Sequence, residues 1–489
     1  MSIVKGFMVP HPPLIIPEVG RGEEKGIEDT VKAYEHVGDE IARIEPETII
    51  VSSPHSLMYS DYFHISGGNG AYGDMSKFGV PEVSMNVDYD TELIDRICSL
   101  AEDSVFPAGT DGEKMPELDH ATFIPLYFVN NGYRRVEAGK VSGTEKEISD
   151  ENIRDSETGK IMYKIVRIGL SGYPLVMHYQ LGIIVRKAVE ELGRKVVWIA
   201  SGDLSHKLKE DGPYGFDKNG PVYDERIMKD MGNADFMSLL DYDETFCEKA
   251  AECGHRSFTM MAGAFDGYDV TPHELSYEGP FGVGYGVCTF DVSSKNDDRH
   301  FLKSFLKNRE NKINEKKAGE DEYVKLARKS LETYIKTRTK ISIPDELPKE
   351  MTDTQAGAFV SLHEFGRLRG CIGTISPVRD CLAEEIIENA ISAATEDPRF
   401  DEIRENELGN IEYSVDVLGP TEKIDSPDML DVKRYGVVVT SGRKRGLLLP
   451  DLDGVDTVTQ QINIAKQKAG IPAGEKDIQL ERFEVVRHY

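Results

Sequence analysis

The sequence predicts an α/β N-terminal domain with a central, mostly parallel sheet covered by helices, followed by an α+β C-terminal domain. Three observations lead to this prediction. Apolar, β-branched runs alternate with segments in which apolar residues recur at helical spacing. The length of 489 residues exceeds what one hydrophobic core usually serves. A highly charged segment interrupts the pattern after about residue 295.

The N-terminal domain is expected over residues 1–295. Its strands are the apolar runs GFMV, ETIIVSS, KIVRIGL and KVVWIAS, which indicate a sheet covered on both faces. The segment HYQLGIIVRKAVEELGRK has helical periodicity, and Gly193 is a stop signal for that helix. The glycines of GPFGVGYGVCTFDV disfavour a helix and favour a closing strand.

Residues 296–321 are expected to form a charged, partly helical linker, because this segment is almost free of large apolar residues after Phe305. The C-terminal domain is expected over residues 322–489. It combines two helical segments, EYVKLARKSLETYIKT and DCLAEEIIENAISAATED, with a glycine-rich centre, FGRLRGCIGTISP. Strand-like runs follow near EYSVDVLG and YGVVVTSG, which together indicate an α+β domain.

The charge balance argues against nucleic acid and membrane as partners. There are 58 Lys and Arg against 86 Asp and Glu, a net charge of −28. Such a surface repels nucleic acid and anionic lipid. No segment is long and apolar enough to predict a membrane span.

The cysteines and the N-terminus indicate a cytoplasmic protein. Six cysteines are scattered without a CxxC pair, which is typical of reduced thiols rather than of a disulfide framework. The first segment, MSIVKGFMVPHPPLIIP, is broken by prolines and lacks the charged region and continuous apolar run of a signal peptide.

Four histidines stand at comparable junctions: His11, His55, His120 and His206. Three of them follow predicted strands directly or closely. Strand ends on one edge of an α/β sheet converge in space, so these imidazoles could meet at one site. A metal site and an acid-base site are both compatible with this pattern, while each histidine taken singly could be structural.

A metal site needs an anionic ligand beside the imidazoles. Two neutral histidines and one anionic group leave open positions on a divalent metal, as in non-haem iron(II) or catalytic zinc sites. The segment AAECGHRSF offers Glu252, Cys253 and His255 at the start of an apolar helix. Glu252 could equally be a solvated carboxylate, and Cys253 a small core residue.

The motifs MVPHPPLIIPEVG, SPHS, LDHATFIPL and SGDLSH together resemble the class III extradiol ring-cleavage dioxygenases and the related Memo family, over roughly residues 1–295. The resemblance implies that His11 and His55 are metal ligands, that His206 is the acid-base histidine, and that His120 lies near the substrate. The families differ at the third ligand. CGHRSF is similar to Memo, which places a cysteine there, so Cys253 is the expected ligand and Glu252 the alternative.

The C-terminal segment resembles the AMMECR-type domain through LRGCIGTISP and NAISAATEDPRF. This family brings no reaction that can be transferred. Cys371 is a candidate reactive thiol, since Arg367, Arg369 and several glycines could lower its pKa or bind an anion. A buried cysteine in a tight turn fits the same pattern.

Together these observations lead us to expect a metal-dependent oxidoreductase of the extradiol dioxygenase type, with iron(II) as the metal and zinc or another divalent ion as the alternative. The expected substrate is a small, aromatic molecule. Related proteins of the Memo and AMMECR types accompany a radical SAM protein, so an enzyme of unassigned reaction working with such a partner is a second hypothesis. A non-catalytic metal-binding scaffold is a third.

Overall fold

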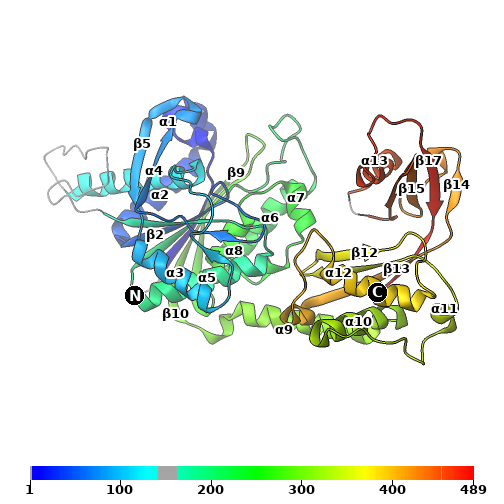
Figure 1. Cartoon of the computed structure of the whole chain (residues 1–489). Coiled ribbons are helices and arrows are strands. Elements are labelled where there is room, and N and C mark those ends of the chain that lie inside the picture. Colours follow the sequence, from blue (N-terminus) through cyan, green and yellow to red (C-terminus); the bar gives the residue numbers. More distant parts are fainter. Residues whose placement is uncertain (1–2, 141–161, 453) are drawn as a thin grey trace. The chain divides into compact units, whose positions relative to one another are not determined.

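The computed structural model describes residues 3–140, 162–452 and 454–489, and it divides into two compact units, Met1–Leu306 and Lys307–Tyr489 (Figure 1). The first unit is built on a six-stranded sheet in the order β7-β2-β8-β1-β10-β9. Its strands are β1 (Ile3–Val9), β2 (Thr48–Ser53), β7 (Lys164–Gly169), β8 (Val196–Ser201), β9 (Tyr268–Glu278) and β10 (Tyr285–Lys295).

Strands β7, β2, β8 and β1 are parallel neighbours. Strand β10 pairs antiparallel with β1, and β9 pairs antiparallel with β10 at the edge of the sheet. The four parallel strands correspond to the four apolar runs of the sequence. Their residues are almost all buried, as expected for a sheet with helices on both faces. The predicted α/β fold of the N-terminal part is confirmed.

The helices of the first unit form two layers. Helix α2 (Glu28–Ile44) packs with α4 (His120–Lys140), and α5 (Leu175–Leu192) packs with α8 (His255–Ala264). Strand β2 shows why they lie on opposite faces. Side chains alternate along a strand, so Ser52 hydrogen-bonds Ser257 of α8, while Ser53 hydrogen-bonds Asp119 at the start of α4.

Smaller elements complete the unit. Helix α5 ends at Gly193, which adopts the left-handed conformation expected of a helix stop. The remaining α-helices are α1 (Pro17–Gly20), α3 (Thr91–Asp103), α6 (Asn219–Gly232) and α7 (Glu244–Ala250). A hairpin of β4 (Gly70–Met75) and β5 (Val80–Asp88), joined by the 3₁₀ turn η3 (Ser76–Phe78), was not predicted from the sequence.

The second unit holds two antiparallel sheets. The first has the order β12-β11-β13-β18, formed by Arg367–Gly373, Ala358–Glu364, Ile411–Leu418 and Val485–His488. Helices α10 (Glu322–Thr337) and α12 (Leu382–Thr395) share a buried core with one face of this sheet. The second sheet is β14-β17-β15-β16, from Glu422–Ile424, Gln479–Phe483, Gly436–Ser441 and Lys444–Leu448, and α13 (Val458–Lys468) packs on β15 and β16. The α+β prediction is confirmed.

Helix α9 (Phe301–Gly319) covers most of the segment that we expect to be a linker. Most of its side chains are exposed, and Phe305 and Ile313 are its buried hydrophobic residues. No helix among the described residues has the length and apolar character needed to cross a membrane.

We propose that residues 296–321 separate two independently stable domains, and we expect limited proteolysis of the full chain to cut between Ser293 and Glu320. Little buried surface opposes local opening of α9, so a protease should reach its backbone before it reaches the two cores. Mass spectrometry of the fragment ends identifies the cut. Cleavage within residues 201–206 or 368–373, with this segment intact, would contradict the proposed boundary.

Candidate metal centre

The four histidines converge at the carboxyl edge of the central sheet. His11 follows β1, His55 follows β2 and His206 follows β8, while His120 begins α4. The ring of His11 lies 4.9 Å from that of His55 and 5.3 Å from that of His120, and the rings of His55 and His120 are 4.3 Å apart. Parallel strands in adjacent positions bring these residues together although they are distant in sequence.

Three donor atoms are arranged as a metal ion would require. His55 Nε2 lies 3.1 Å from His11 Nε2, and Cys253 Sγ lies 3.6 Å from the same atom. The three donor atoms, one each from His11, His55 and Cys253, all lie within 4.8 Å of one another. Ligands about 2.0–2.3 Å from a metal lie roughly 3–4 Å from one another, so this group fits a single ion.

The imidazole donors are neutral, whereas the thiol donor must lose a proton to bind a cation. Burial lowers the pKa of His11 well below its ordinary value, and the neighbouring His55, His120 and His206 lower it further, so the imidazole is neutral. Burial, with the nearby Asp203 and Glu252, raises the pKa of the Cys253 thiol. Binding of a metal by this cysteine would therefore release a proton.

The orientation of the His11 ring is fixed by contacts on the side away from His55. Its Nδ1 lies 3.1 Å from Ser201 Oγ, so Nε2 faces His55, and its backbone N–H donates to Asp203 Oδ1 at 2.7 Å. His11 is buried, whereas His55 is exposed. The donor group is thus held firmly on one side and open on the other. Outer contacts of this kind set the ring orientation of metal-binding histidines.

Cys253 is positioned by the loop that carries Asp203. The backbone N–H of Asp203 donates to Cys253 Sγ at 3.3 Å, and its carbonyl accepts from the N–H groups of Cys253 and Gly254. The two segments touch at glycines, because a Cβ on Gly202 would come within 2.1 Å of Gly254 Cα. Neither position can accept a larger residue without a backbone shift.

The carboxylate of Glu252 points away from the donor atoms of His11, His55 and Cys253. Its Oε2 accepts a hydrogen bond of 2.6 Å from the backbone N–H of His255, the first residue of α8. It therefore satisfies one of the free N–H groups at the helix start. His255 is also turned away, with Nε2 2.9 Å from the carbonyl of Leu239.

His206 stands in the loop after β8, and other parts of the chain hold that loop. Its backbone N–H donates to the carbonyl of Ala250, and the preceding Ser205 N–H donates to Asp224 Oδ1 at 2.8 Å. Its ring Nε2 is 4.0 Å from Asp203 Oδ2. Burial lowers the pKa of His206, while the carbonyls of Ala251 and Leu204 near the ring oppose this change. The buried Nδ1 makes no hydrogen bond of good geometry within the described residues.

His120 is held by its neighbour Asp119, which the sequence reasoning overlooked. The Asp119 carboxylate accepts from Ser53 Oγ at 2.6 Å and from both the N–H and the hydroxyl of Thr122 at 2.9 Å. It therefore caps α4 and sets the direction in which the helix presents His120. Burial, followed by the neighbouring His55, lowers the pKa of His120 to about 4.

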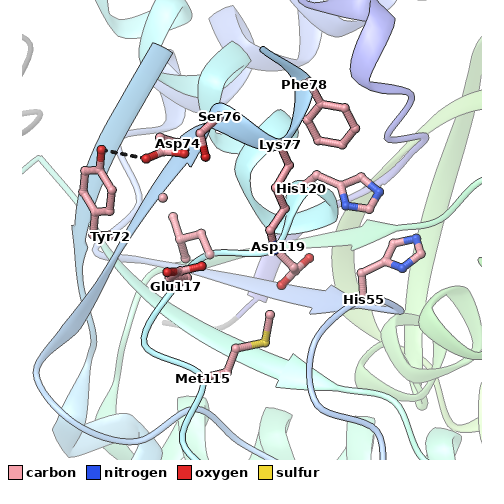
Figure 2. Close-up of a pocket in the computed structure, with 12 residues that line it drawn as sticks. His55, Tyr72, Asp74, Ser76, Lys77, Phe78, Met115, Glu117, Asp119 and His120 are labelled. Atoms are coloured by element: carbon pink, nitrogen blue, oxygen red, sulfur yellow. Dashed lines mark hydrogen bonds between the residues drawn. The ribbon is translucent and has the colours of Figure 1, made fainter. Parts of the chain in front are cut away.

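A pocket of about 290 Å³ opens beside these histidines (Figure 2). His55 and His120 line one side of it, and the ring of Phe78 lies 5.7 Å from that of His120. Strand β4 and the turn η3 of the β4–β5 hairpin supply much of the wall, and this hairpin was not predicted from the sequence. The alternation in VPEVSMNVD after Gly79 was the available signal. Besides His55, Phe78 and His120, the residues that line the pocket are Tyr72, Gly73, Asp74, Ser76, Lys77, Met115, Glu117, Leu118 and Asp119.

The fold and the site together define an α/β domain with a histidine-rich site at the carboxyl edge of its sheet. A family model described as the catalytic LigB subunit of aromatic ring-opening dioxygenase matches residues 5–288, more than half of the chain, so the chain belongs to this family. A second model, AMMECR1, matches residues 324–488. The expected fusion of the two families is confirmed.

Three relatives illustrate the range of similarity. Protein CA_C1420 of Clostridium acetobutylicum is 42% identical over 496 residues, covering 100% of this chain and 99% of its own. A protein of Thermotoga maritima is 48% identical over 171 residues, 35% of this chain and 98% of its own. The crystal structure of the uncharacterized protein PH0010 from Pyrococcus horikoshii has 32% identity and a TM-score of 0.32, and the match covers 34% of this chain and 88% of that one.

Asp224 gives a test of how the His206 loop is held. Burial raises the pKa of its carboxyl to about 7, although Ser205 and Tyr277 donate hydrogen bonds to it. The unfolded chain ionises this group near pH 4, so the wild-type protein loses stability as the pH rises from about 4 to about 7. We expect the unfolding free energy of Asp224→Asn, relative to wild type, to rise by about 1–3 kcal/mol between pH 5 and pH 8.

Urea denaturation at both pH values measures this difference. Glu225→Gln, an exposed change on the same helix, is the matched control. Parallel stability profiles for Asp224→Asn and wild type would show that the carboxyl is already ionised in the folded chain.

Proposed function

We propose that the first unit is a metal-dependent enzyme in which His11, His55 and Cys253 hold one divalent transition metal, with iron(II) as the first candidate and zinc or another divalent ion as the alternative. The observation that carries the proposal is the convergence of three donor atoms, from three distant segments, within 4.8 Å. Two neutral imidazoles and a thiolate are a suitable ligand set for such metals.

The reaction we propose is oxidative opening of a small aromatic ring, as the family description implies. When bound, the metal would supply open positions for a phenolic substrate and for O₂. The exposed face of His55 and the adjoining pocket of about 290 Å³ support this, since together they give a single-ring molecule access to the donor group. His120, which lines the same pocket, is proposed to contact the substrate.

His206 is proposed as the acid-base residue. Its pKa is lowered by burial, so its ring is neutral at neutral pH and can take a proton from a substrate hydroxyl at a ring nitrogen. Asp203 Oδ2, 4.0 Å from Nε2, can orient the ring once the proton has been taken up. The proton is then available for return to the opened product.

A second candidate function is favoured by the thiol at Cys253. A thiolate shifts the potential of an iron site and can itself be oxidised, which suits O₂ chemistry less well than a carboxylate ligand. This feature favours a metal enzyme of a different reaction, acting on a small molecule with a radical SAM protein as partner. A non-catalytic metal-binding scaffold would have the same ligands but would not need His206.

These alternatives are separated by one experiment on protein prepared without air. Metal analysis identifies the bound ion, and O₂ uptake is then measured with a series of catechols. Uptake that depends on both the metal and a catechol supports the dioxygenase. A loaded protein that consumes no O₂ with any of them favours the second candidate.

We expect the anaerobically prepared chain to bind close to one divalent transition metal, and His11→Ala or His55→Ala to abolish this binding. Nearby carboxylates cannot replace an imidazole at equal affinity for iron or zinc. Plasma emission spectroscopy of the dialysed proteins measures the metal content. Unchanged metal in both variants would exclude the proposed site.

Glu252 and Cys253 provide a matched pair for the third ligand. Cys253→Ser should lower the metal content more than Glu252→Gln, since the sulfur faces His11 while the carboxylate binds the N–H of His255. The opposite order would transfer the ligand role to Glu252.

We expect His206→Ala to keep its metal while any turnover falls by roughly a hundredfold or more, the usual effect of losing an acid-base group. Metal analysis and O₂ uptake on the same sample measure the two properties. Loss of metal together with activity would make His206 a ligand. Full activity would remove its proposed catalytic role.

A further inference from the structure

The ring of His206 lacks the hydrogen bond that fixes the ring of His11. In His11, Nδ1 lies 3.1 Å from Ser201 Oγ, which sets the ring orientation. In His206, Nδ1 is buried but makes no hydrogen bond of good geometry within the described residues, although two backbone carbonyls lie near the ring. Its Nε2 is 4.0 Å from Asp203 Oδ2, which is beyond hydrogen-bond distance. Hydrogen bonds therefore do not decide how this ring is oriented.

Tyr214 supplies an aromatic contact to this imidazole. The two rings are perpendicular, and their centroids lie 5.1 Å apart. Edge-to-face pairs at such distances are favourable beyond the area that they bury. No other aromatic ring in the described part of the chain makes such a contact with His206. The Tyr214 ring therefore restricts the rotation of the imidazole about its side-chain bonds.

Backbone bonds fix the loop that carries Tyr214. This loop, residues 207–218, follows His206 and precedes α6. Leu208 and Phe216 pair across it as an antiparallel bridge. At its base, the N–H of Leu208 donates to the carbonyl of Gly282 at 3.1 Å. The two arms of the loop are thus tied to each other and to the rest of the unit.

Glycines shape the tip of the loop. Gly215, directly after Tyr214, has a φ of 74°, in the left-handed region that favours glycine. Its N–H donates to the carbonyl of Gly212 at 3.2 Å and closes the turn around Tyr214. A Cβ on Gly212 would lie 3.2 Å from Gly282 Cα, so the turn packs closely on a second segment. The backbone therefore sets the position of Tyr214.

Core packing does not explain why an aromatic ring stands at this position. The Tyr214 side chain is 60% exposed, so it buries little apolar surface. Phe216 on the same loop is 46% exposed, and among the described residues it makes no ring contact with His206. The contact that distinguishes Tyr214 from Phe216 is the one with the imidazole.

We propose that Tyr214 is a positioning residue for His206, which holds the imidazole in the orientation needed to exchange a proton with the substrate. This inference rests on the proposed function, because that function makes His206 the acid-base residue. Tyr214 acts through His206 and does not itself bind the substrate. The alternative is that Tyr214 has only a structural role in its loop.

The kinetics of O₂ uptake with catechols, on metal-loaded protein prepared without air, test this role. We expect Tyr214→Leu to lower kcat by roughly three- to tenfold, the effect of losing one edge-to-face contact, and to leave KM within about twofold. Tyr214→Phe keeps the ring and should restore most of the rate. In a His206→Ala background, Tyr214→Leu should cost no further rate, because the residue that it positions is absent.

Phe216→Leu is the matched control, since it removes an exposed ring from the same loop without touching His206. It should leave kcat unchanged. The metal content of all variants should equal that of the wild type, because the loop carries none of the three proposed ligands.

A second measurement does not depend on turnover. The full-length chain is loaded with zinc and labelled with ¹³C at histidine Cε1, and the His206 signal is assigned by its absence from His206→Ala. Tyr214→Leu should lower the order parameter of this Cε1–H bond by roughly 0.2 or more, whereas Tyr214→Phe and Phe216→Leu should not. If the wild type opens no catechol but this order parameter falls, the proposed reaction fails and the positioning contact stands.

Four results would overturn the proposal. A rise in KM alone in Tyr214→Leu would make Tyr214 a substrate contact. An equal loss of kcat in Phe216→Leu would show a general effect of the loop. A further loss of rate on adding Tyr214→Leu to His206→Ala would show that Tyr214 does not act through His206. An unchanged order parameter in Tyr214→Leu would show that the ring of His206 is held without it.

Discussion

The candidate metal centre depends on the contacts of one residue, Asp203. Its carboxylate accepts the backbone N–H of His11, its N–H donates to the sulfur of Cys253, and its carbonyl accepts two N–H groups from the turn before α8. Two segments from distant parts of the chain, one at His11 and one at Cys253 and Gly254, are thereby fixed to one loop. This requires Gly202 and Gly254 to meet without side chains. It also requires a buried carboxyl whose pKa burial raises to about 7, so the arrangement is unfavourable by itself. The role of this loop in holding His11 and Cys253 explains why a buried carboxyl stands at this position.

The histidines connect the donor group to the pocket. His55 belongs to both, with Nε2 beside His11 and its side chain on the pocket wall. A molecule in the pocket would therefore be in contact with a ligand residue. Because the imidazoles are neutral and close together, the region attracts a cation and disfavours protonation, which is the electrostatic condition for binding a metal.

The second unit has a buried core of its own. Helices α10 and α12 pack there on one face of the sheet that carries Cys371. The donor residues of the candidate metal centre all belong to the first unit.

The sequence by itself determined the fold classes, the two families and the four candidate histidines, three of them after strands, because hydrophobic periodicity and short motifs are local properties. It left Glu252 and Cys253 as alternatives, since neighbours in a turn diverge according to how α8 meets the loop at Asp203. In the tertiary structure the sulfur faces His11 and the carboxylate faces the helix start. Nor could it decide the partner of Arg369, which lies two residues before Cys371 and donates to Glu407. Only folding could decide these neighbours, because a contact between distant segments depends on how whole elements pack and not on any local pattern.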